Sequence, residues 1–377
     1  MKSLRTSTRP AQRGFTLVEL MVGLVLGMLT VLVITQVLST AEGTKRSITM
    51  GSDAQVNGAL SLFTLQREIQ QAGYGATQIP EAMGCQIKGK REGAAAFSLT
   101  LAPVVIANGG ATPDNDAPDT ITVLQARTSG VSTPMLLTGN HSPTDTSYAV
   151  ASSFGAVVNN MMIAVPKVQG AGTWCTLFNV TNDASAPLLS LGPTRIPNAT
   201  GTAGPWNHSE VYPAAGYALG DSLLNMGSLV SRTYSISNAH SLAVAELSAT
   251  SGIVGAAQEL YPQIVNLQAF YGKDTNSDGV VDLYDATTPL TNDGWKQVLA
   301  IRIAVVARSN QFEKEEVTTS APLWDVGSTA TFNDVTTATC GSSKCISLKV
   351  DQIDQWKHYR YKIFDTIVPL RNVLWNS

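Results

Sequence analysis

Charged side chains are scarce in this sequence. Only 14% of its 377 residues are Asp, Glu, Lys or Arg, against about 25% in ordinary soluble domains. The formal net charge is −3, whereas proteins that bind nucleic acid carry a clustered basic face. Nucleic acid is therefore not an expected partner. Ser, Thr, Ala, Gly and Asn fill the deficit, a composition more typical of exported β-rich surfaces than of cytosolic enzymes.

Signals for catalysis are also missing. No spacing selects a nucleophile, a base and an orienting residue, and no glycine-rich phosphate loop is present. His358 falls in an expected strand, where a structural role is the better interpretation. The four histidines are scattered along the chain: His141, His208, His240 and His358. We therefore expect a protein without enzymatic activity.

One long uncharged run dominates the amino-terminal part. It extends from Leu20 to Ala41, 22 residues that span about 33 Å as a helix, enough to cross a hydrocarbon layer ~30 Å thick. A carboxylate, Glu19, stands at the head of this run. Ionisable residues at such positions are costly in lipid and are usually functional. The sequence therefore predicts a membrane helix whose first acid needs a partner.

The residues before this run allow three interpretations. Met1–Gly14 contain four basic side chains and no acid, so the amino terminus should stay in the cytoplasm while the rest is exported. An ordinary secretory signal, cut near Ser39–Ala41, has a shorter apolar region and does not begin with a carboxylate. A plain single-pass anchor leaves the string Gly14-Phe15-Thr16-Leu17-Val18-Glu19 unexplained.

The third interpretation rests on that string, which resembles the processing site of the type IV pilin superfamily. The resemblance implies that a prepilin peptidase cuts after Gly14 and that Phe15 becomes the methylated first residue. Glu19 is then the acid four positions later. A buried carboxylate is tolerated where a cation compensates it, so Glu19 is expected to pair with the new amino terminus of a neighbouring subunit. Removing the four leader charges changes the formal net charge from −3 to −7.

Beyond the membrane, the helix is expected to continue as an amphipathic segment, residues 42–75. Gly51 and Gly58 weaken its interior by roughly 1 kcal/mol each relative to Ala and permit bending. Gly73-Tyr74-Gly75 provide the stop. A helix from Phe15 to Ala72 is about 87 Å long, so half of it must find partners in lipid or in other helices. The expected apolar face consists of Val56, Ala59, Leu60, Phe63, Leu65, Ile69 and Ala72.

After residue 76 the pattern changes to short strands bounded by turn residues. In the stretch Val298–Arg308, the side chains of Leu299, Ile301, Ile303 and Val305 share one face and Arg302 lies on the other. The fold class is therefore α+β, with a long amino-terminal helix packed on a large antiparallel β-rich domain, residues 76–377, of one or two lobes. The expected strands are Thr120–Leu124, Met161–Val165, Leu229–Ile236, Val298–Arg308 and His358–Val368, with Pro369 ending the last.

The exported part contains four cysteines and no Cys-x-x-Cys pair, which argues against a zinc site. An even count in an exported chain favours disulfides over free thiols. Cys340 and Cys345 flank a short turn, so we pair them with each other. The pair Cys85–Cys175 follows by elimination. Closing that long loop contributes about 4 to 5 kcal/mol on the chain-entropy model.

An acidic stretch carries the sharpest motif of the exported part. Counted from Asp274, oxygen-bearing side chains stand at positions 1, 3, 5, 9 and 12, with Gly279 at position 6. This is the ligand order of a calcium-binding loop. The expected calcium ligands are Asp274, Asn276, Asp278, Asp282, Asp285 and the backbone carbonyl of Val280.

An acidic surface turn between strands is the alternative for this stretch. The match also departs from a full EF-hand, because position 12 is Asp285 rather than Glu and because the flanks, residues 267–271 and 287–291, do not look like helices. The stretch therefore resembles the looser calcium loops of extracellular modules, whose dissociation constants are about 10⁻⁴ to 10⁻³ M.

Further strings resemble one branch of the pilin superfamily, the minor pilins of the PilW family. The family implies a low-abundance subunit that primes or caps pilus assembly together with other minor pilins, the major pilin and a large tip adhesin. It also implies processing by the prepilin peptidase and contact with the inner-membrane assembly platform. The strings are Arg67–Gly75, Asn225–Val230, Arg232–Ser235, Phe270–Gly272 and Pro369–Asn372.

The same resemblance implies a single-pass inner-membrane protein with a cytoplasmic amino terminus and a periplasmic carboxyl-terminal domain, which later joins the pilus. Two rival hypotheses stay open. A minor pseudopilin of type II secretion shares the amino-terminal motif and differs in its partners. A secreted calcium-binding adhesin, released after Ala41, lacks the helix altogether.

Overall fold

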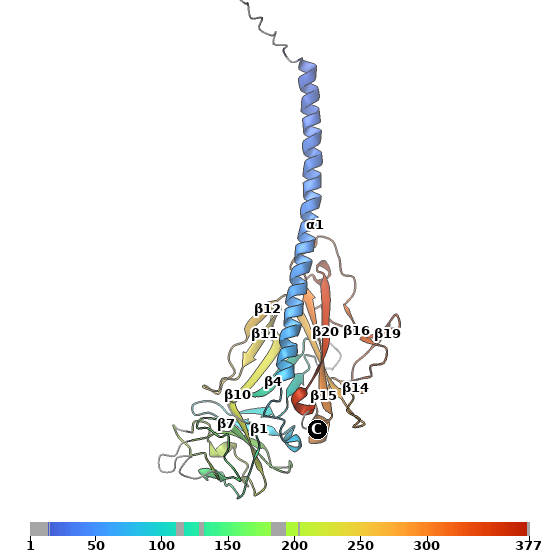
Figure 1. Cartoon of the computed structure of the whole chain (residues 1–377). Coiled ribbons are helices and arrows are strands. Elements are labelled where there is room, and N and C mark those ends of the chain that lie inside the picture. Colours follow the sequence, from blue (N-terminus) through green and yellow to red (C-terminus); the bar gives the residue numbers. More distant parts are fainter. Residues whose placement is uncertain are drawn as a thin grey trace, which may run out of the picture. The chain divides into compact units, whose positions relative to one another are not determined.

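The structure is a computed structural model that describes residues 14, 16–110, 117–127, 132–181, 194–202 and 204–374 (Figure 1). For residues 43–52 it describes the backbone alone. The chain divides into two compact units, residues 1–52 and residues 53–377. The first holds the amino-terminal part of one long helix, and the second holds the rest of that helix together with the β-rich domain.

Among the described residues, the long helix is followed by short helices and by many strands. The helices are α1 (Leu17–Gln71), α2 (Asn292–Lys296) and α3 (Arg371–Leu374), with the 3₁₀ helices η1 (Pro80–Ala82), η2 (Ser209–Val211) and η3 (Trp356–His358). The strands are β1 (Gln86–Gly89), β2 (Phe97–Thr100), β3 (Val104–Ala107), β4 (Thr120–Arg127), β5 (Met135–Leu136), β6 (Ser147–Ala149), β7 (Met161–Val165), β8 (Cys175–Asn179), β9 (Arg195–Pro197), β10 (Ser222–Ile236), β11 (Ser241–Glu246), β12 (Gln258–Pro262), β13 (Ile264–Lys273), β14 (Leu283–Asp285), β15 (Val298–Arg308), β16 (Leu323–Gly327), β17 (Phe332–Asn333), β18 (Ala338–Cys340), β19 (Ser343–Ser347) and β20 (Tyr361–Pro369).

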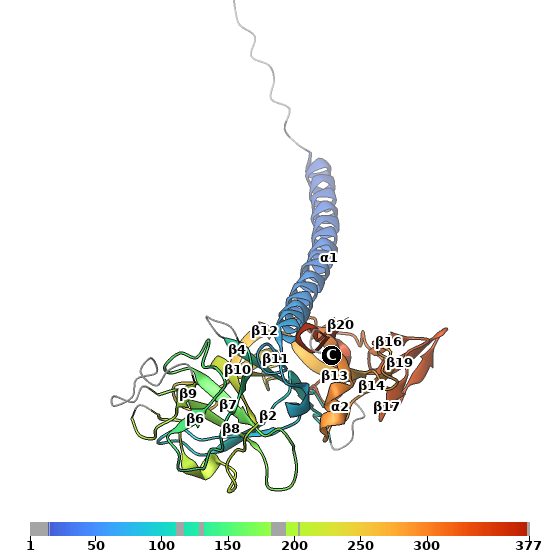
Figure 2. The same cartoon turned by 60° about the horizontal axis from the view of Figure 1, so that its bottom comes forward.

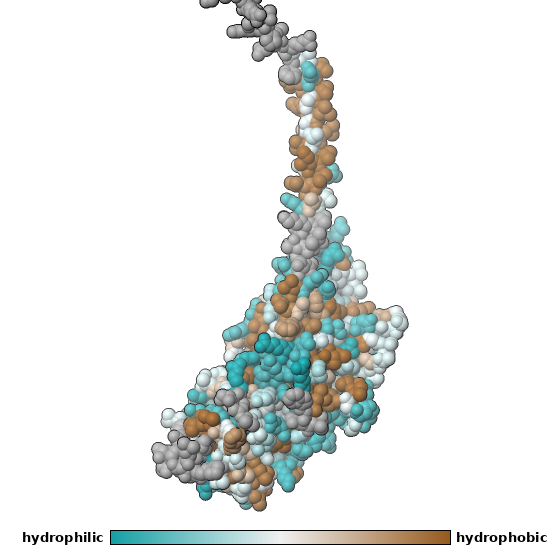
Figure 3. All heavy atoms as spheres, viewed as in Figure 1, coloured by the Kyte–Doolittle hydropathy of each residue, from teal (hydrophilic) through white to brown (hydrophobic). Residues whose placement is uncertain are grey.

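The first unit carries the predicted membrane helix. Residues Leu17–Glu42 have a mean hydropathy of 2.6 and are long and apolar enough to cross a membrane, and most of their surface is brown in Figure 3. The hydroxyl groups of Thr30 and Thr35 donate hydrogen bonds of 2.8–3.0 Å to backbone carbonyls one turn earlier. Because these hydroxyls are satisfied within the helix, they add little to the free-energy cost of placing it in lipid.

In the second unit, α1 packs on the β-rich domain along a narrow face. Three residues of the predicted apolar face are fully buried: Leu65, Ile69 and Ala72. Three others are 43–61% exposed: Val56, Leu60 and Phe63. Ala59 is exposed as well. The expected apolar face therefore packs on the domain only through its carboxyl-terminal part. The stretch of helix with the exposed residues contacts the domain through a different set of residues.

That set is made of small residues: Ala54, Gly58 and Ser61 are buried where Val56, Leu60 and Phe63 are not. Gly58 lies directly against strand β20, because a Cβ atom at this position would be only 2.2 Å from a ring carbon of Phe364. From the sequence, Gly58 was expected only to weaken and bend the helix. In the structure it allows the helix backbone and an aromatic ring to come into close contact.

Two large sheets form the body of the second unit (Figure 2). The first has ten strands, with the order β12-β11-β10-β7-β8-β1-β2. In addition, β4 and β5 pair with β10, and β3 pairs with β4. The second has five, in the order β17-β14-β13-β15-β20. Pairing is antiparallel except for β1 with β8 and β14 with β17. Smaller sheets are formed by β16-β19-β18 and by β6-β9.

A shared hydrophobic core lies between α1 and the two large sheets. It contains Leu65 and Ile69 of the helix, Val123 of β4 and Ile301 and Ile303 of β15, among others. In Figure 1 the last turns of α1 run between strands β10–β12 and β20. The predicted α+β class, a long helix packed on a large β-rich domain, is confirmed.

The predicted strand positions are largely correct. β7 and β15 have the expected bounds, whereas β10 begins seven residues earlier than predicted, at Ser222, and passes through a bulge at Gly227. Ile301 and Ile303 face the shared core as expected, and Arg302 faces the opposite side, where its guanidinium carbon lies 5.2 Å from the Trp324 ring centroid.

The last strand differs more. β20 begins at Tyr361, so His358 is not in a strand but in η3, with its Nδ1 2.8 Å from the carbonyl of Glu313. β20 ends at Pro369, one residue beyond the predicted end at Val368, and Pro369 is itself paired in register with Ala300.

A polar seam joins the two large sheets near the start of β4. The backbone N–H of Asp119 donates to the Leu267 carbonyl of β13 at 2.8 Å. The Asp119 carboxylate accepts from the N–H groups of Ala269, at 2.9 Å, and Gly109, at 3.2 Å. Burial raises the pKa of Asp119 to about 7, against the opposing effect of these two donors.

Substituting Gly58 tests the contact between α1 and β20. Alanine is a better helix former by about 1 kcal/mol, but overpacking a filled site costs about 1–3 kcal/mol. Gly58→Ala should therefore lower the thermal unfolding temperature of the full chain in detergent. In a Phe364→Ala background the same change should raise it, because the clash is gone and the helix propensity remains. A stabilising effect of Gly58→Ala in both backgrounds would contradict the close contact.

The Asp119 carboxyl should make stability depend on pH. Its folded-state pKa of about 7 lies above the ordinary value of 3.8, so the folded protein binds more protons than the unfolded chain between these values. This contribution is present below about pH 4 and is lost as the pH rises through about 7. The free energy of unfolding of the wild type, measured with urea and compared with that of Asp119→Asn, should therefore decrease from pH 5 to pH 8. A stability difference that does not vary with pH would exclude Asp119 as the titrating group.

Candidate functional site

The predicted processing residues lie at the beginning of α1. Gly14 and Glu19 are described and exposed, whereas Phe15 lies outside the described residues. Among the described residues, the Glu19 carboxylate has no hydrogen-bond or ion-pair partner, which leaves it accessible to another molecule.

Thr16 caps the helix that Glu19 enters. The Glu19 N–H lies 3.3 Å from the Thr16 hydroxyl oxygen, and the Leu20 N–H donates to the Thr16 carbonyl at 3.2 Å. Thr-x-x-Glu is the spacing of a capping box, and an acid in the first turn is stabilised by the positive end of the helix dipole. The sequence analysis missed Thr16, although its distance from Glu19 was readable.

The predicted calcium loop connects strand β13 to strand β14. This agrees with the sequence on either side of the loop, which does not have a helical pattern. Asp274 organises the turn, because its carboxylate accepts hydrogen bonds from the backbone N–H groups of Ser277 at 2.6 Å and Gly279 at 2.7 Å. Desolvation raises the pKa of Asp274, but the backbone N–H donors outweigh it and the net pKa is lowered. This carboxyl group is therefore ionised at neutral pH.

The other predicted ligands follow along the same hairpin. The Asp278 carboxylate accepts from the Val280 N–H at 2.8 Å and from the Asn276 amide at 3.1 Å. The Asp282 carboxylate accepts from the N–H and hydroxyl groups of Thr275 at 2.9–3.3 Å. These side chains form hydrogen bonds within the loop and are exposed to solvent.

Asp285 differs from the rest. It belongs to β14, where it forms an ion pair with Lys273 and accepts a hydrogen bond of 2.8 Å from the Thr287 N–H. The loop residues do not bring three carboxylate oxygens within 4.8 Å of one another in the described part of the chain; the one group that meets this distance is Asp325, Cys340 and Cys345. Those two cysteines are bonded to each other.

Both predicted disulfides are present. Cys85–Cys175 links the residue before β1 to the start of β8, with a Cα–Cα distance of 5.9 Å. Cys340–Cys345 joins β18 to β19, with a Cα–Cα distance of 5.8 Å. The first is buried and joins the neighbouring strands β1 and β8 of the ten-stranded sheet. The second closes the hairpin of β18 and β19.

The carboxyl-terminal end of α1 is closed by a residue 300 positions away. The side-chain amide of Asn372 donates to the carbonyls of Ala72, at 2.9 Å, and Gln71, at 3.3 Å. The Thr77 hydroxyl donates to the Asn372 carbonyl at 2.9 Å. Gly73, with φ +78°, turns the chain away from the helix. Local sequence gives no signal for a distant cap, so the sequence analysis missed Asn372.

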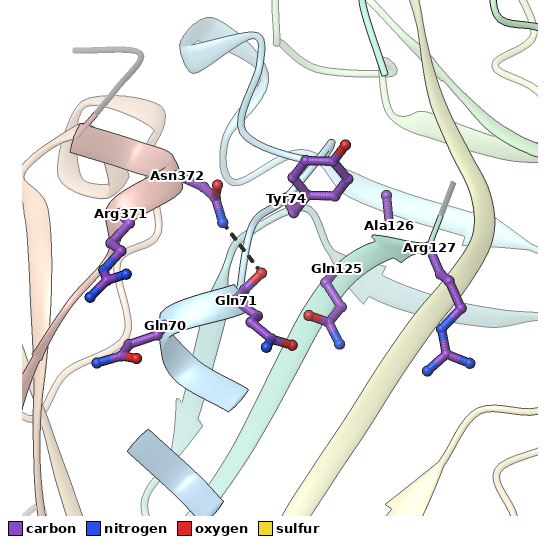
Figure 4. Close-up of a pocket in the computed structure, with 8 residues that line it drawn as sticks. All are labelled: Gln70, Gln71, Tyr74, Gln125, Ala126, Arg127, Arg371 and Asn372. Atoms are coloured by element: carbon purple, nitrogen blue, oxygen red, sulfur yellow. Dashed lines mark hydrogen bonds between the residues drawn. The ribbon is translucent and has the colours of Figure 1, made fainter. Parts of the chain in front are cut away.

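A cleft of about 500 Å³ adjoins this helix end (Figure 4). We call it the helix-end cleft. Tyr74 and Ala126 contribute to its wall, and its remaining lining side chains are polar. They are the amides of Gln70, Gln71, Gln125 and Asn372 and the guanidinium groups of Arg127 and Arg371. Helix α1, strand β4 and helix α3 thus all supply residues to it, and none of the described lining residues is acidic.

Comparison with known protein families gives matches at both ends of the chain. Residues 9–35 match the prokaryotic N-terminal methylation motif. Residues 225–372 match type IV pilus-assembly protein W. No curated protein matches the chain.

These two stretches fall on the structural features described above. The first contains Gly14, the Thr16 cap and Glu19, and it runs into the apolar helix. The second begins within β10 and ends at Asn372, the residue that caps α1. Together, the methylation motif at the head of an apolar helix and the match in the β-rich domain support a PilW-type minor pilin of the type IV pilus.

Proposed function

We propose that this minor pilin primes or caps type IV pilus assembly and has a structural, non-enzymatic role. The observation that carries the proposal is the combination of a methylation motif and a capped apolar helix with a second unit of residues 53–377. A domain of that size suits one end of a filament better than repeated packing along the shaft.

The helix accounts for the assembly step. After cleavage at Gly14, the apolar segment Leu17–Glu42 holds the subunit in the inner membrane. Transfer into a bundle of pilin helices exchanges one apolar environment for another, so little hydrophobic free energy is lost. The exposed Glu19 carboxylate then pairs with the ammonium group of Phe15 on a neighbouring subunit and fixes the register between the two helices.

The proposed partners follow from this role. They are the prepilin peptidase, the inner-membrane assembly platform, other minor pilins, the major pilin and a large tip adhesin. The amino terminus lies in the cytoplasm, the second unit lies in the periplasm, and the assembled protein lies in the pilus. A minor pseudopilin of type II secretion would have the same anchor but would co-purify with secretion components instead of pilus components.

Loss of the Glu19 charge should prevent incorporation. In cells lacking their own copy of the protein, the wild type should restore filaments and Glu19→Ala should not, because the neighbour's ammonium group loses its partner. Electron microscopy of surface filaments measures this. Glu42→Ala, at the other end of the apolar segment, is the matched control and should assemble normally.

Mass spectrometry of the wild-type amino terminus completes the test. Methylated Phe15 is expected. A mature chain beginning at Glu42 would indicate the secreted adhesin, and wild-type levels of filaments with Glu19→Ala would contradict the pairing role.

We further propose that the β13–β14 loop binds calcium. The support is the order of its oxygen ligands, Asp274, Asn276, Asp278 and Asp282 with the Val280 carbonyl, on one short connection. Because Asp285 is held by Lys273, these residues form the proposed ligand set and Asp285 stays outside it. The fit requires the carboxylates to move closer together than they are in the structure, and the exposed position of Asp278 and Asp282 permits this.

Calcium should then stabilise the second unit. At a tenfold excess over the dissociation constant, binding adds about 1.4 kcal/mol to the free energy of unfolding, measurable as a higher melting temperature of the full chain. Asp278→Ala should abolish the shift. Asp293→Ala, a nearby exposed carboxylate outside the loop, should keep it. Equal melting temperatures with and without calcium would exclude the site.

A further inference from the structure

The helix-end cleft contains an amide side chain that has no partner within the described part of the chain. Gln125 is only 9% exposed, and its side chain makes no hydrogen bond among the described residues. Its amide is not among the polar atoms that are fully shut off from solvent, and Gln125 lines the cleft. In Figure 4 the Gln125 and Gln71 side chains extend toward the same side of the cleft. The wall of the cleft therefore presents hydrogen-bonding groups that a ligand can satisfy.

Two positive charges accompany these amides. Arg127 and Arg371 lie on opposite sides of the cleft in Figure 4, and neither has an ion-pair partner in the part of the chain that the structure describes. Arg232, on the adjacent strand β10, shows the usual alternative, because Glu68 and Glu246 lie 3.1 Å and 2.8 Å from it. The cleft is thus a local basic site on a chain whose formal net charge is −3.

The position at a helix terminus does not oppose this basic character. The carboxyl-terminal end of a helix disfavours anions, because its last carbonyls carry a partial negative charge. Here Asn372 bonds the carbonyls of Gln71 and Ala72. Those two carbonyls therefore have a donor of their own, and the two guanidinium groups are the charged groups among the described residues that line the cleft.

We propose that the helix-end cleft binds a short acidic peptide segment of a partner protein. Carboxylates of the segment pair with Arg127 and Arg371, and its peptide groups bond the amides of Gln71 and Gln125. Glutamine side chains both donate and accept hydrogen bonds, which suits a peptide backbone, whereas a simple inorganic anion needs donors alone. Guanidinium groups on opposite sides of a 500 Å³ space also suit two separate carboxylates better than one small ion.

This proposal extends the proposed function and rests on it in one respect, namely that the partner is another pilus subunit. The cleft is formed by the last turn of α1, by β4 and by α3. A segment bound there contacts the place where the end of helix α1 meets strand β4 and helix α3. A neighbouring subunit would thereby be fixed relative to the helix that enters the filament.

The probe is a fluorescently labelled peptide, Gly-Glu-Glu-Glu-Gly with blocked ends, and Gly-Gln-Gln-Gln-Gly is its neutral counterpart. Binding to the full chain in detergent micelles is followed by fluorescence anisotropy. The acidic peptide should bind and the neutral one should not. The double variant Arg127→Gln/Arg371→Gln should weaken binding by about tenfold, the combined effect of two exposed ion pairs.

Two more variants locate the effect. Gln125→Leu removes the buried amide without changing the charge and should also weaken binding several-fold. Arg195→Gln removes an exposed arginine elsewhere on the domain and should change nothing. Circular dichroism and the melting temperature confirm that each variant is folded.

Three results would overturn the proposal. They are no binding of the acidic peptide, equal binding by the Arg127→Gln/Arg371→Gln variant, or complete displacement of the peptide by inorganic phosphate at equal concentration. These outcomes are independent of the filament assay with Glu19→Ala. A failed peptide test with intact dependence on Glu19 rejects the cleft and leaves the pilin function in place.

Discussion

The structure of the second unit depends on the contacts that its last elements, β20 and α3, make with helix α1. Phe364 of β20 packs against the bare backbone of Gly58, and Asn372 of α3 bonds the final helix carbonyls. Between these contacts, Leu65 and Ile69 enter the core shared with both large sheets. The helix is therefore an integral part of the β-rich domain from residue 53 onward, and its orientation within that domain is set at both ends of the contact.

This arrangement explains the distribution of apolar surface on α1. Small residues face the domain where the helix first meets it, and large ones follow near its end. Val56, Leu60 and Phe63 remain exposed. A helix that serves two environments must divide its apolar residues between them, and an apolar residue at helical spacing is therefore not a reliable indication of burial in the same chain.

Much of the fold could be predicted from the sequence, because the relevant signals were local. The uncharged run predicted the apolar part of helix α1, and Gly73 predicted where the helix ends. β7 and β15 are continuous apolar stretches, buried on both faces, so their bounds were clear. The short spacing of Cys340 and Cys345 selected one disulfide and left one choice for the other. Thr16 was also readable from its distance to Glu19.

The remaining features depend on contacts between distant segments. The start of β10 is hidden by the bulge at Gly227, and no local pattern shows that Gly58 meets Phe364. The helix-end cleft combines Gln70 and Gln71 with Gln125 and with Arg371. These residues come from three separate stretches of the sequence. None of the three stretches indicates that the other two lie beside it in the fold. The ion pair between Lys273 and Asp285 likewise depends on the pairing of β13 with β14, which the spacing of the acidic stretch alone does not show.

The cap supplied by Asn372 has a consequence for biogenesis. Helix α1 is among the first segments to leave the ribosome, yet its final carbonyls obtain their partner only when a residue 300 positions later has been synthesised. Contacts so far apart in the chain form late, because a long loop must close first. Until the carboxyl-terminal segment has been made, the end of α1 lacks its cap, so the second unit cannot complete its fold while the chain is still being synthesised.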